Sequence, residues 1–146
     1  MARARQEMGK PFSVRFSRRT DLFVQQEATR TKRTKSAIVE SLAEEAATIR
    51  RFGGLAFRGD DWDRRPSVIG TGLDVWEIVD MLKSYDGDIE RLVADNRLER
   101  RHVQLALGYY EEHREEIDEA IADNRRSVEE LKSHYPFVQF VETSRQ

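Results

Sequence analysis

Hydrophobic and polar residues alternate strictly near the start of the chain, from Phe12 to Phe16. This alternation is typical of a half-buried β-strand, because successive side chains of a strand point to opposite faces. One face would carry Phe12, Val14 and Phe16, and the other would carry Ser13 and Arg15. The pattern therefore predicts a short strand with one apolar and one polar face.

Two short amphipathic helices are predicted directly after this strand. Ser17 is the expected cap of the first helix and Thr34 the expected cap of the second. The first helix has one face formed by four residues: Thr20, Phe23, Val24 and Ala28. The second repeats apolar residues at helical spacing: Ile38, Val39, Leu42, Ala43, Ala46 and Ile49. The polar, basic residues 29–35 between them predict a turn.

Helical periodicity returns in the second half of the chain. Gly53 and Gly54 interrupt the pattern, and an irregular stretch follows in which residues 55–57 and 67–69 are candidate short strands. Helices are then predicted over three ranges and over a long acidic segment: residues 74–84, 88–94, 99–112 and onward to about residue 133. These patterns predict a mainly α fold with a few short strands and a long C-terminal helix.

A strand followed by two short helices is not expected to be stable alone. The strand would leave backbone hydrogen-bonding groups unpaired, and helices of about a dozen residues bury too little apolar surface. Pairing with the same strand of a second chain solves both problems and produces a homodimer. A two-stranded ribbon fits the major groove of double-stranded DNA, where Ser13 and Arg15 would contact base edges.

The charge distribution indicates a polyanionic partner near the start of the chain. The net charge is −2, yet residues 1–36 hold ten Lys and Arg against three Asp and Glu, so the remainder carries −9. A basic front on an acidic body favours DNA contact at that front. The second helix also begins with free N–H groups and a positive dipole end. The predicted phosphate contacts lie in the arm and at this helix start: Arg3, Arg5, Lys10, Arg33, Thr34, Lys35 and Ser36.

The stretch from Pro11 to Ala46, PFSVRFSRRTDLFVQQEATRTKRTKSAIVESLAEEA, resembles the ribbon-helix-helix (CopG/Arc-like) family of bacterial repressors and antitoxins. The resemblance implies a dimeric module with one strand and two helices. Lys32 stands where that family usually has Gly, so either a Lys adopts the left-handed conformation or the turn differs. Thr20 and Glu27 occupy first-helix positions that are commonly apolar in the family.

The following region is similar to a bacterial domain-of-unknown-function family (number 433) found in toxin–antitoxin operons. Four segments carry this resemblance: Gly70-Thr71-Gly72, Leu73 to Glu77, Val103 to Tyr110, and Glu116-Ile117-Asp118. Members are similar to helix-turn-helix domains. The combination of both modules resembles VapB-type antitoxins. That resemblance implies a PIN-like ribonuclease toxin as partner and autorepression through the protein's own operator.

The three helices predicted between residues 74 and 112 suit a helix-turn-helix core. The last of them would offer four residues to DNA: Arg97, Arg100, Arg101 and Gln104. Glu99, Glu111 and Glu112 lie on the same helix and oppose that role. Dimerisation or toxin contact is the competing role for this domain.

The end of the chain is apolar for a terminus. An amphipathic helix is followed by Phe137 to Val141, which alternates loosely. Such an exposed apolar segment is typical of a docking site for another protein. The candidate toxin-binding residues are Val128, Leu131, Phe137 and Phe140.

Several other functions are not supported by the sequence. The chain has no cysteine, and no apolar run approaches the roughly 20 residues of a membrane-spanning helix. A cytoplasmic protein without membrane contact is expected. Asp60, Asp61 and Asp63 do not have the spacing of an EF-hand loop, and the Glu99–His102 pair has no second copy. Neither a metal site, a cofactor nor an enzymatic activity is expected.

The expected organisation of the chain has four segments. Residues 1–10 form a flexible basic arm and residues 11–50 the ribbon-helix-helix domain. Residues 51–124 form the helix-turn-helix-like domain, and residues 125–146 the end of the last helix and a tail that binds the toxin. Two alternatives to the antitoxin stay open: a stand-alone repressor without a toxin, and a dimeric interaction protein that does not bind DNA.

Overall fold

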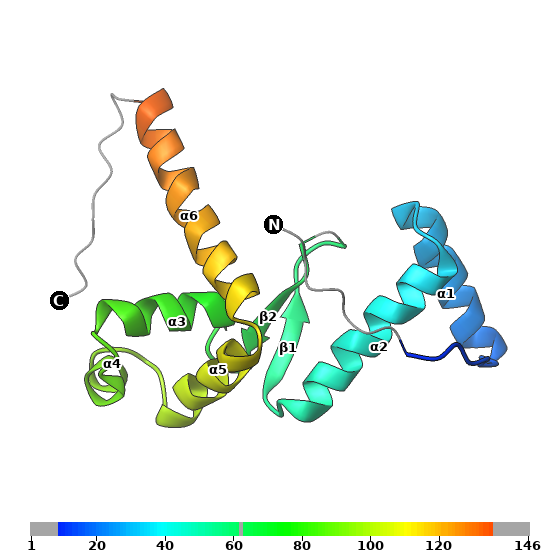
Figure 1. The fold of residues 1–146 in the computed structure, drawn as a ribbon, viewed down its shortest axis with the longest axis horizontal. Coiled ribbons are helices and arrows are strands. Elements are labelled where there is room, and N and C mark those ends of the chain that lie inside the picture. The colour runs from blue at the N-terminus through cyan, green and yellow to red at the C-terminus, as the bar shows by residue number, and fades with distance from the viewer. Residues whose placement is uncertain (1–8, 62, 136–146) are drawn as a thin grey trace. The chain divides into compact units, whose positions relative to one another are not determined.

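The structure is a computed structural model that describes residues 9–61 and 63–135 (Figure 1). This part of the chain is mainly helical, with one small antiparallel sheet. Its elements follow in the order α1 (Arg18–Thr31), α2 (Lys35–Arg51), β1 (Leu55–Arg58), β2 (Arg65–Val68), β3 (Leu73–Asp74), α3 (Val75–Ser84), α4 (Ile89–Asp95), α5 (Arg100–Glu112) and α6 (Arg114–His134). The chain forms two compact units, Met1–Ala43 and Glu44–Gln146.

The N-terminal unit contains α1 and the start of α2, joined by a tight turn. The Ser17 hydroxyl accepts a hydrogen bond from the Thr20 N–H at 3.3 Å, so the predicted cap of α1 is confirmed. Lys32 follows α1 with φ 55° and ψ 35°, and the next N–H, of Arg33, donates to Ala28 O at 3.0 Å. Lys32 thus adopts the left-handed conformation, which costs a residue with a Cβ about 1–2 kcal/mol.

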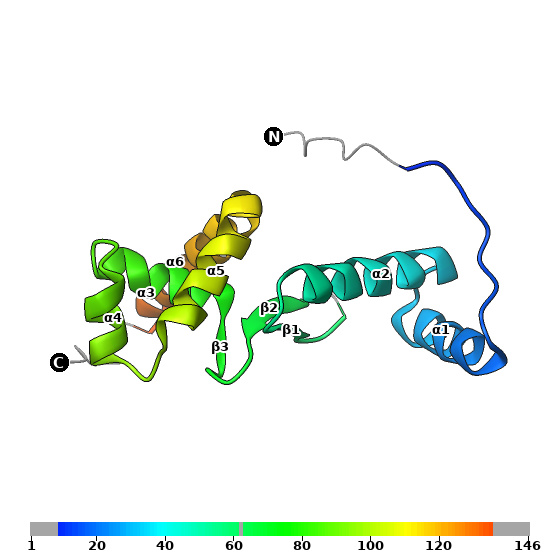
Figure 2. The ribbon, with the colours of Figure 1, turned by 90° about the horizontal axis from the view of Figure 1, so that it is seen from below.

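The strand predicted over Phe12–Phe16 is not present in the single chain. Residues 9–17 belong to no helix or strand and lead as an irregular segment into α1 (Figure 2). The physical reason is that a strand exists only where its backbone hydrogen-bonds to a neighbouring strand. All three strands of the described chain belong to the C-terminal unit, so a single N-terminal unit supplies no such neighbour.

The C-terminal unit is built around a continuous hydrophobic core. Helix α3 contacts α4, α5, α6 and the sheet, so this core lies between four helices and the sheet (Figure 1). Its most completely buried large side chains come from different elements: Leu55, Val68, Ile78, Leu92, Val103 and Ile117. Burial of each such side chain stabilises the unit by roughly 1.5–3 kcal/mol.

The small sheet has the strand order β1-β2-β3 with antiparallel pairing. Leu55 lies opposite Val68, and Ser67 lies opposite Asp74. The two strands suggested by the sequence are confirmed in position, although β2 begins at Arg65 and ends at Val68. Strand β3 was not expected, because its two residues are too few to produce a pattern.

The helices of the C-terminal unit begin and end close to the predicted residues. Asp74 and Asp88 precede α3 and α4, and the Asp88 carboxylate accepts the Arg91 N–H at 3.0 Å. The tight turn before Asp88 uses positive φ angles at Asp86 and Gly87, 53° and 81°. Within the described residues, no helix has the length and apolar character needed to cross a membrane.

Helices α5 and α6 meet at His113, where an aromatic cluster forms. The His113 ring stacks on Tyr109 with centroids 4.0 Å apart, and Phe52 meets Tyr109 edge-on at 5.5 Å. The Tyr109 hydroxyl donates to the Glu116 carboxylate at 3.1 Å, while burial raises the pKa of Tyr109 well above its ordinary value. This cluster explains why Tyr109 is buried and the neighbouring Tyr110 only partly so.

Candidate nucleic-acid interface

The two residues predicted to contact bases lie in the segment that precedes α1. Ser13 and Arg15 are both exposed, as is Lys10. Among the described residues, neither Ser13 nor Arg15 has a hydrogen bond or ion pair. Their side chains are therefore available to a ligand such as DNA.

Three of the four residues predicted to contact phosphates at the start of α2 already bond to neighbouring residues of the chain. Thr34 caps the helix, because its hydroxyl accepts the Ala37 N–H at 3.1 Å. The Arg33 guanidinium donates to Ala37 O at 3.2 Å and to Ser41 Oγ at 2.7 Å, so it folds back onto α2. Lys35 Nζ lies 2.6 Å from Asp21 Oδ1 of α1. Ser36 is exposed.

Two arginines of the same unit were missed by the sequence reasoning. Arg18 and Arg19 are the first two residues of α1, and both are exposed. Neither has an ion pair or hydrogen bond within the described chain. A cation at a helix N-terminus is disfavoured by the helix dipole, typically by about 0.3–1 kcal/mol. The sequence contained the signal for this placement, because Arg18 and Arg19 directly follow Ser17, the predicted helix cap, and lie close to Arg15.

Arginine pairing differs between the two units. In the C-terminal unit most arginines are in ion pairs with carboxylates: Arg51, Arg58, Arg64, Arg65, Arg100, Arg101, Arg125 and Arg126. The Glu45 carboxylate, for example, accepts hydrogen bonds from Arg64 and raises the pKa of that guanidinium. In the described N-terminal unit Arg15, Arg18 and Arg19 have no such partner. Arg50, Arg91, Arg97 and Arg114 of the C-terminal unit likewise have no ion pair in the described part of the chain, but residues 37–146 carry a net charge of −9, whereas residues 1–36 carry +7. Positive charge that carboxylates do not balance is therefore concentrated near the start of the chain.

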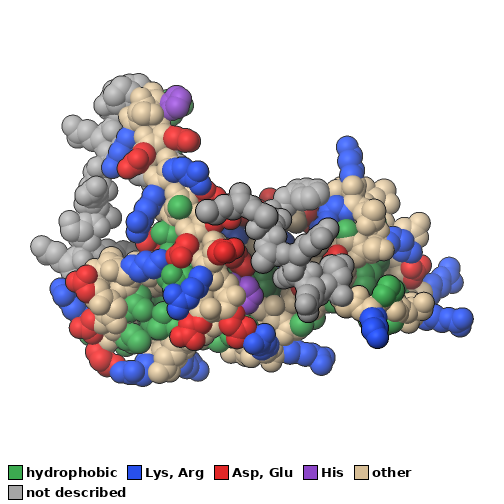
Figure 3. All heavy atoms as spheres, in the orientation of Figure 1, with side chains coloured by type: hydrophobic (Ala, Val, Ile, Leu, Met, Phe, Trp, Pro, Cys, Tyr) green, Lys and Arg blue, Asp and Glu red, His purple; other side chains and the backbone are tan. Residues whose placement is uncertain are grey.

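The N-terminal unit also exposes many large hydrophobic side chains. Of its described large hydrophobics, only Val24 and Ile38 are buried. Six others have exposed fractions from 41% to 86%: Phe12, Val14, Phe16, Leu22, Phe23 and Leu42. Figure 3 shows hydrophobic side chains at the surface among Lys and Arg side chains on this unit. The N-terminal unit therefore buries few large hydrophobic side chains and leaves most of them at its surface.

The second predicted DNA-contact helix, α5, is less suited to phosphates than expected. Arg97, Arg100, Arg101 and Gln104 were predicted to contact DNA, and Arg97, Arg100 and Arg101 carry its positive charge. However, Arg100 pairs with Glu90, and Arg101 Nε lies 2.8 Å from Glu99 Oε2. Arg97 lies before the helix, which begins at Arg100 rather than Glu99. Nearby acidic residues therefore neutralise two of the four candidates.

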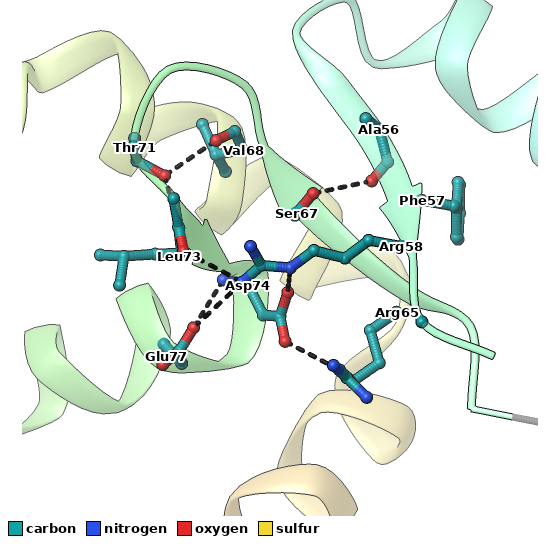
Figure 4. Close-up of polar contacts among 12 residues, drawn as sticks. Ala56, Phe57, Arg58, Arg65, Ser67, Val68, Thr71, Leu73, Asp74 and Glu77 are labelled. Carbon is teal, nitrogen blue, oxygen red and sulfur yellow. Dashed lines mark hydrogen bonds and ion pairs between the residues drawn. The ribbon is translucent and has the colours of Figure 1, made fainter.

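A charged cluster in the C-terminal unit was also missed by the sequence reasoning. Asp74 is buried, and its carboxylate accepts hydrogen bonds from Arg58 Nε at 2.6 Å and Arg65 Nε at 2.9 Å (Figure 4). Glu77 accepts the Asp74 backbone N–H at 2.7 Å, which completes the cap of α3. The bond to Asp74 raises the pKa of Arg65. This cluster joins β1 and β2 to the start of α3, so its role is structural.

Several candidate residues lie outside the described part of the chain. These are Arg3 and Arg5 of the arm and Phe137 and Phe140 of the tail. The Val128 side chain is likewise outside the described part. Leu131 is 47% exposed on α6, in agreement with a surface role.

No metal site forms among the described residues. Over residues 9–61 and 63–135, no group of three His, Asp or Glu side chains is placed to hold a metal ion. His102 instead accepts the Glu99 N–H through Nδ1 at 3.1 Å, as part of the cap of α5.

Comparison of the chain with protein-family models, curated proteins and solved structures found no match.

Proposed function

We propose that the protein binds double-stranded DNA as a homodimer through its N-terminal unit. The observation that carries this proposal is the occurrence of exposed apolar residues together with uncompensated cations in one compact unit, Met1–Ala43. A second copy would cover Phe12, Val14 and Phe16 by pairing the two segments as an antiparallel ribbon. Ser13 and Arg15 would then project together into the major groove.

The phosphate contacts would come from both sides of this ribbon. Lys10, Arg18 and Arg19 flank it in sequence and are exposed. The start of α2 adds the backbone N–H groups and the positive dipole end behind the Thr34 cap. These contacts would fix the position of the dimer on DNA, and the ribbon would read the sequence.

Fluorescence anisotropy with the DNA just upstream of the gene tests this proposal. The wild-type protein should bind it with an affinity that falls steeply with salt concentration. Arg15→Ala should weaken binding to that site by about 1–3 kcal/mol, and weaken binding to random DNA much less. Arg97→Ala is the comparison, because Arg97 is an exposed cation of the second candidate interface at α5 and should change binding much less than Arg15→Ala.

Two outcomes would contradict the proposal in different ways. If Arg97→Ala weakens binding and Arg15→Ala does not, α5 and its N-terminal turn are the reading element. If the wild-type protein binds no DNA, the N-terminal unit is a dimerisation device only. Sedimentation of Phe16→Asp, which places a charge on the proposed dimer face, should show monomers where the wild type is dimeric.

We also propose that the protein is an antitoxin whose C-terminal segment binds a PIN-like ribonuclease toxin and that the dimer represses its own operon. The resemblance described for the sequence motivates this proposal, and the end of α6 supports it. Leu131 on α6 and Tyr135 directly after the helix are each 47% exposed there. Removal of residues 127–146 should abolish toxin binding while DNA binding remains. A stand-alone repressor would instead purify from its native host with nothing stoichiometric bound.

A further inference from the structure

The ion pair between Asp21 and Lys35 lies where the proposed interface would meet a phosphate. Lys35 is the first residue of α2, and its Nζ atom lies 2.6 Å from Asp21 Oδ1. The two side chains are 52% and 50% exposed, so solvent and ions reach both. The pair connects α1 to α2, since the residues are 14 positions apart.

Asp21 has another cation nearby in its own helix. It lies in the first turn of α1, where it follows Arg18 by three residues, a spacing that favours an ion pair. Its carboxylate nevertheless bonds to Lys35, and Arg18 has no partner in the described chain. Asp21 therefore compensates the charge of Lys35 at the N-terminus of α2, where the helix dipole opposes a cation.

We propose that the Asp21 carboxylate competes with a DNA phosphate for binding to Lys35. This inference rests on the proposed function, because it concerns the same interface. A Lys ammonium held by a carboxylate at 2.6 Å has to leave that carboxylate, or share its donors, to reach a phosphate oxygen. Binding then exchanges one anion for another instead of adding a new ion pair.

This exchange has two consequences for DNA binding. The affinity of the wild-type dimer is lower than its number of cations would give, because part of each Lys35 interaction replaces an existing one. The DNA affinity also falls less steeply with salt concentration. When Lys35 binds a phosphate, that phosphate releases salt cations, but the freed Asp21 carboxylate takes salt cations up. Asp21 thus weakens binding to random DNA, which depends on phosphate contacts alone.

Asp21→Asn tests the inference, because the amide keeps the shape of the side chain and removes its charge. We expect Asp21→Asn to bind both the upstream site and random DNA roughly two- to fivefold more tightly. Its slope of log affinity against log salt should be steeper by up to about 0.9 for each phosphate that Lys35 binds. Asp21→Glu keeps the charge and should bind like the wild type.

Glu112→Gln is the matched control for the removal of one negative charge. Glu112 pairs with Arg51 at 2.7 Å and is 39% exposed, but it belongs to the C-terminal unit. Its substitution should change DNA affinity by less than the Asp21→Asn substitution at every salt concentration.

A double-mutant cycle with Lys35→Gln completes the test. Lys35→Gln should weaken binding more in the Asp21→Asn background than in the wild type, because only there is the Lys35–phosphate interaction wholly new. Equal effects in both backgrounds, with unchanged affinity and salt slope in Asp21→Asn, would overturn the inference while leaving the proposed function intact. A wild-type protein that binds no DNA would overturn both.

Discussion

Lys83 Nζ lies 2.7 Å from Asp118 Oδ1, and this ion pair joins α3 to α6 in the C-terminal unit. The Tyr110 hydroxyl donates to the same Asp118 oxygen at 2.9 Å, and the Lys83 ammonium lies 5.1 Å from the centre of the Tyr110 ring. Three helices therefore meet at one carboxylate, because Tyr110 belongs to α5. The hydrogen bond from Lys83, followed by that from Tyr110, lowers the pKa of Asp118 below its ordinary value of 3.8.

This lowered pKa predicts a pH-dependent contribution to stability. A carboxylate with a lower pKa in the folded state stabilises the fold above its unfolded pKa, and this contribution is lost as the pH falls through the folded pKa. Asp118→Asn should therefore lower the melting temperature at neutral pH and have little effect well below pH 3.8. The Lys83 and Asp118 side chains are 44% and 50% exposed, so the destabilisation should be below about 1 kcal/mol.

Thermal melts of wild type and Asp118→Asn across this pH range would test the prediction. Glu129→Gln, an exposed substitution on α6 with no ion pair among the described residues, is the control and should follow the wild type. A constant difference between wild type and Asp118→Asn at all pH values would mean that the effect comes from packing and not from charge.

The Asp74 cluster predicts a larger decrease in stability. Asp74→Ala would remove the acceptor of two arginine hydrogen bonds and the side chain of the residue that precedes α3. Hydrogen bonds to charged groups contribute about 1.5–3 kcal/mol each. Arg58 and Arg65 are partly exposed and would be rehydrated, so we expect a net destabilisation of about 2–3 kcal/mol.

Urea unfolding of Asp74→Ala measures this change directly. Asp63→Ala provides the comparison, because Asp63 also pairs with Arg65 but its side chain is 69% exposed. Its substitution should cost less than about 1 kcal/mol. Similar decreases for both variants would show that the burial of Asp74 is unimportant for the stability of the C-terminal unit.

The elements that depend on local pattern could be predicted from the sequence. Ser17 and Thr34 marked helix starts, because a capping side chain acts on N–H groups within three residues of itself. The helix over Val75–Ser84 was visible from its apolar spacing. For the turn after α1 the sequence left two options, a left-handed Lys32 or a different turn. Its length could be predicted from the sequence, but the backbone angles of Lys32 could not.

Features that depend on distant parts of the chain could not be predicted. Asp74 accepts bonds from Arg58, 16 residues away, and Lys35 pairs with Asp21 across two helices. Nothing in a local pattern selects one partner among the 25 Lys and Arg residues. The strand over Phe12–Phe16 fails for a related reason, because the N-terminal unit of a single chain holds no strand that could pair with it. Charge pairing and strand pairing are both properties of the assembled structure.

Arg18 and Arg19 lead to a prediction in which DNA binding and stability change in opposite directions. Both cations lie at the N-terminus of α1, where the helix dipole disfavours them. If they bind phosphates, Arg18→Gln and Arg19→Gln should each weaken binding equally on specific and random DNA. Each substitution should also reduce the salt slope by about 0.9 for every phosphate that is no longer neutralised.

The same substitutions should make the free protein more stable. Removal of a cation from the first turn of a helix is expected to stabilise it by about 0.3–1 kcal/mol at low salt. Arg50→Gln is the matched control, because Arg50 is an exposed cation in the last turn of α2, where the dipole favours it. Arg50→Gln should reduce stability slightly and leave the salt slope unchanged. Anisotropy and thermal melts on the same samples would measure both effects. If Arg18→Gln and Arg19→Gln stabilise the protein without changing DNA affinity, these arginines lie outside the interface, and phosphate binding is restricted to the arm and the start of α2.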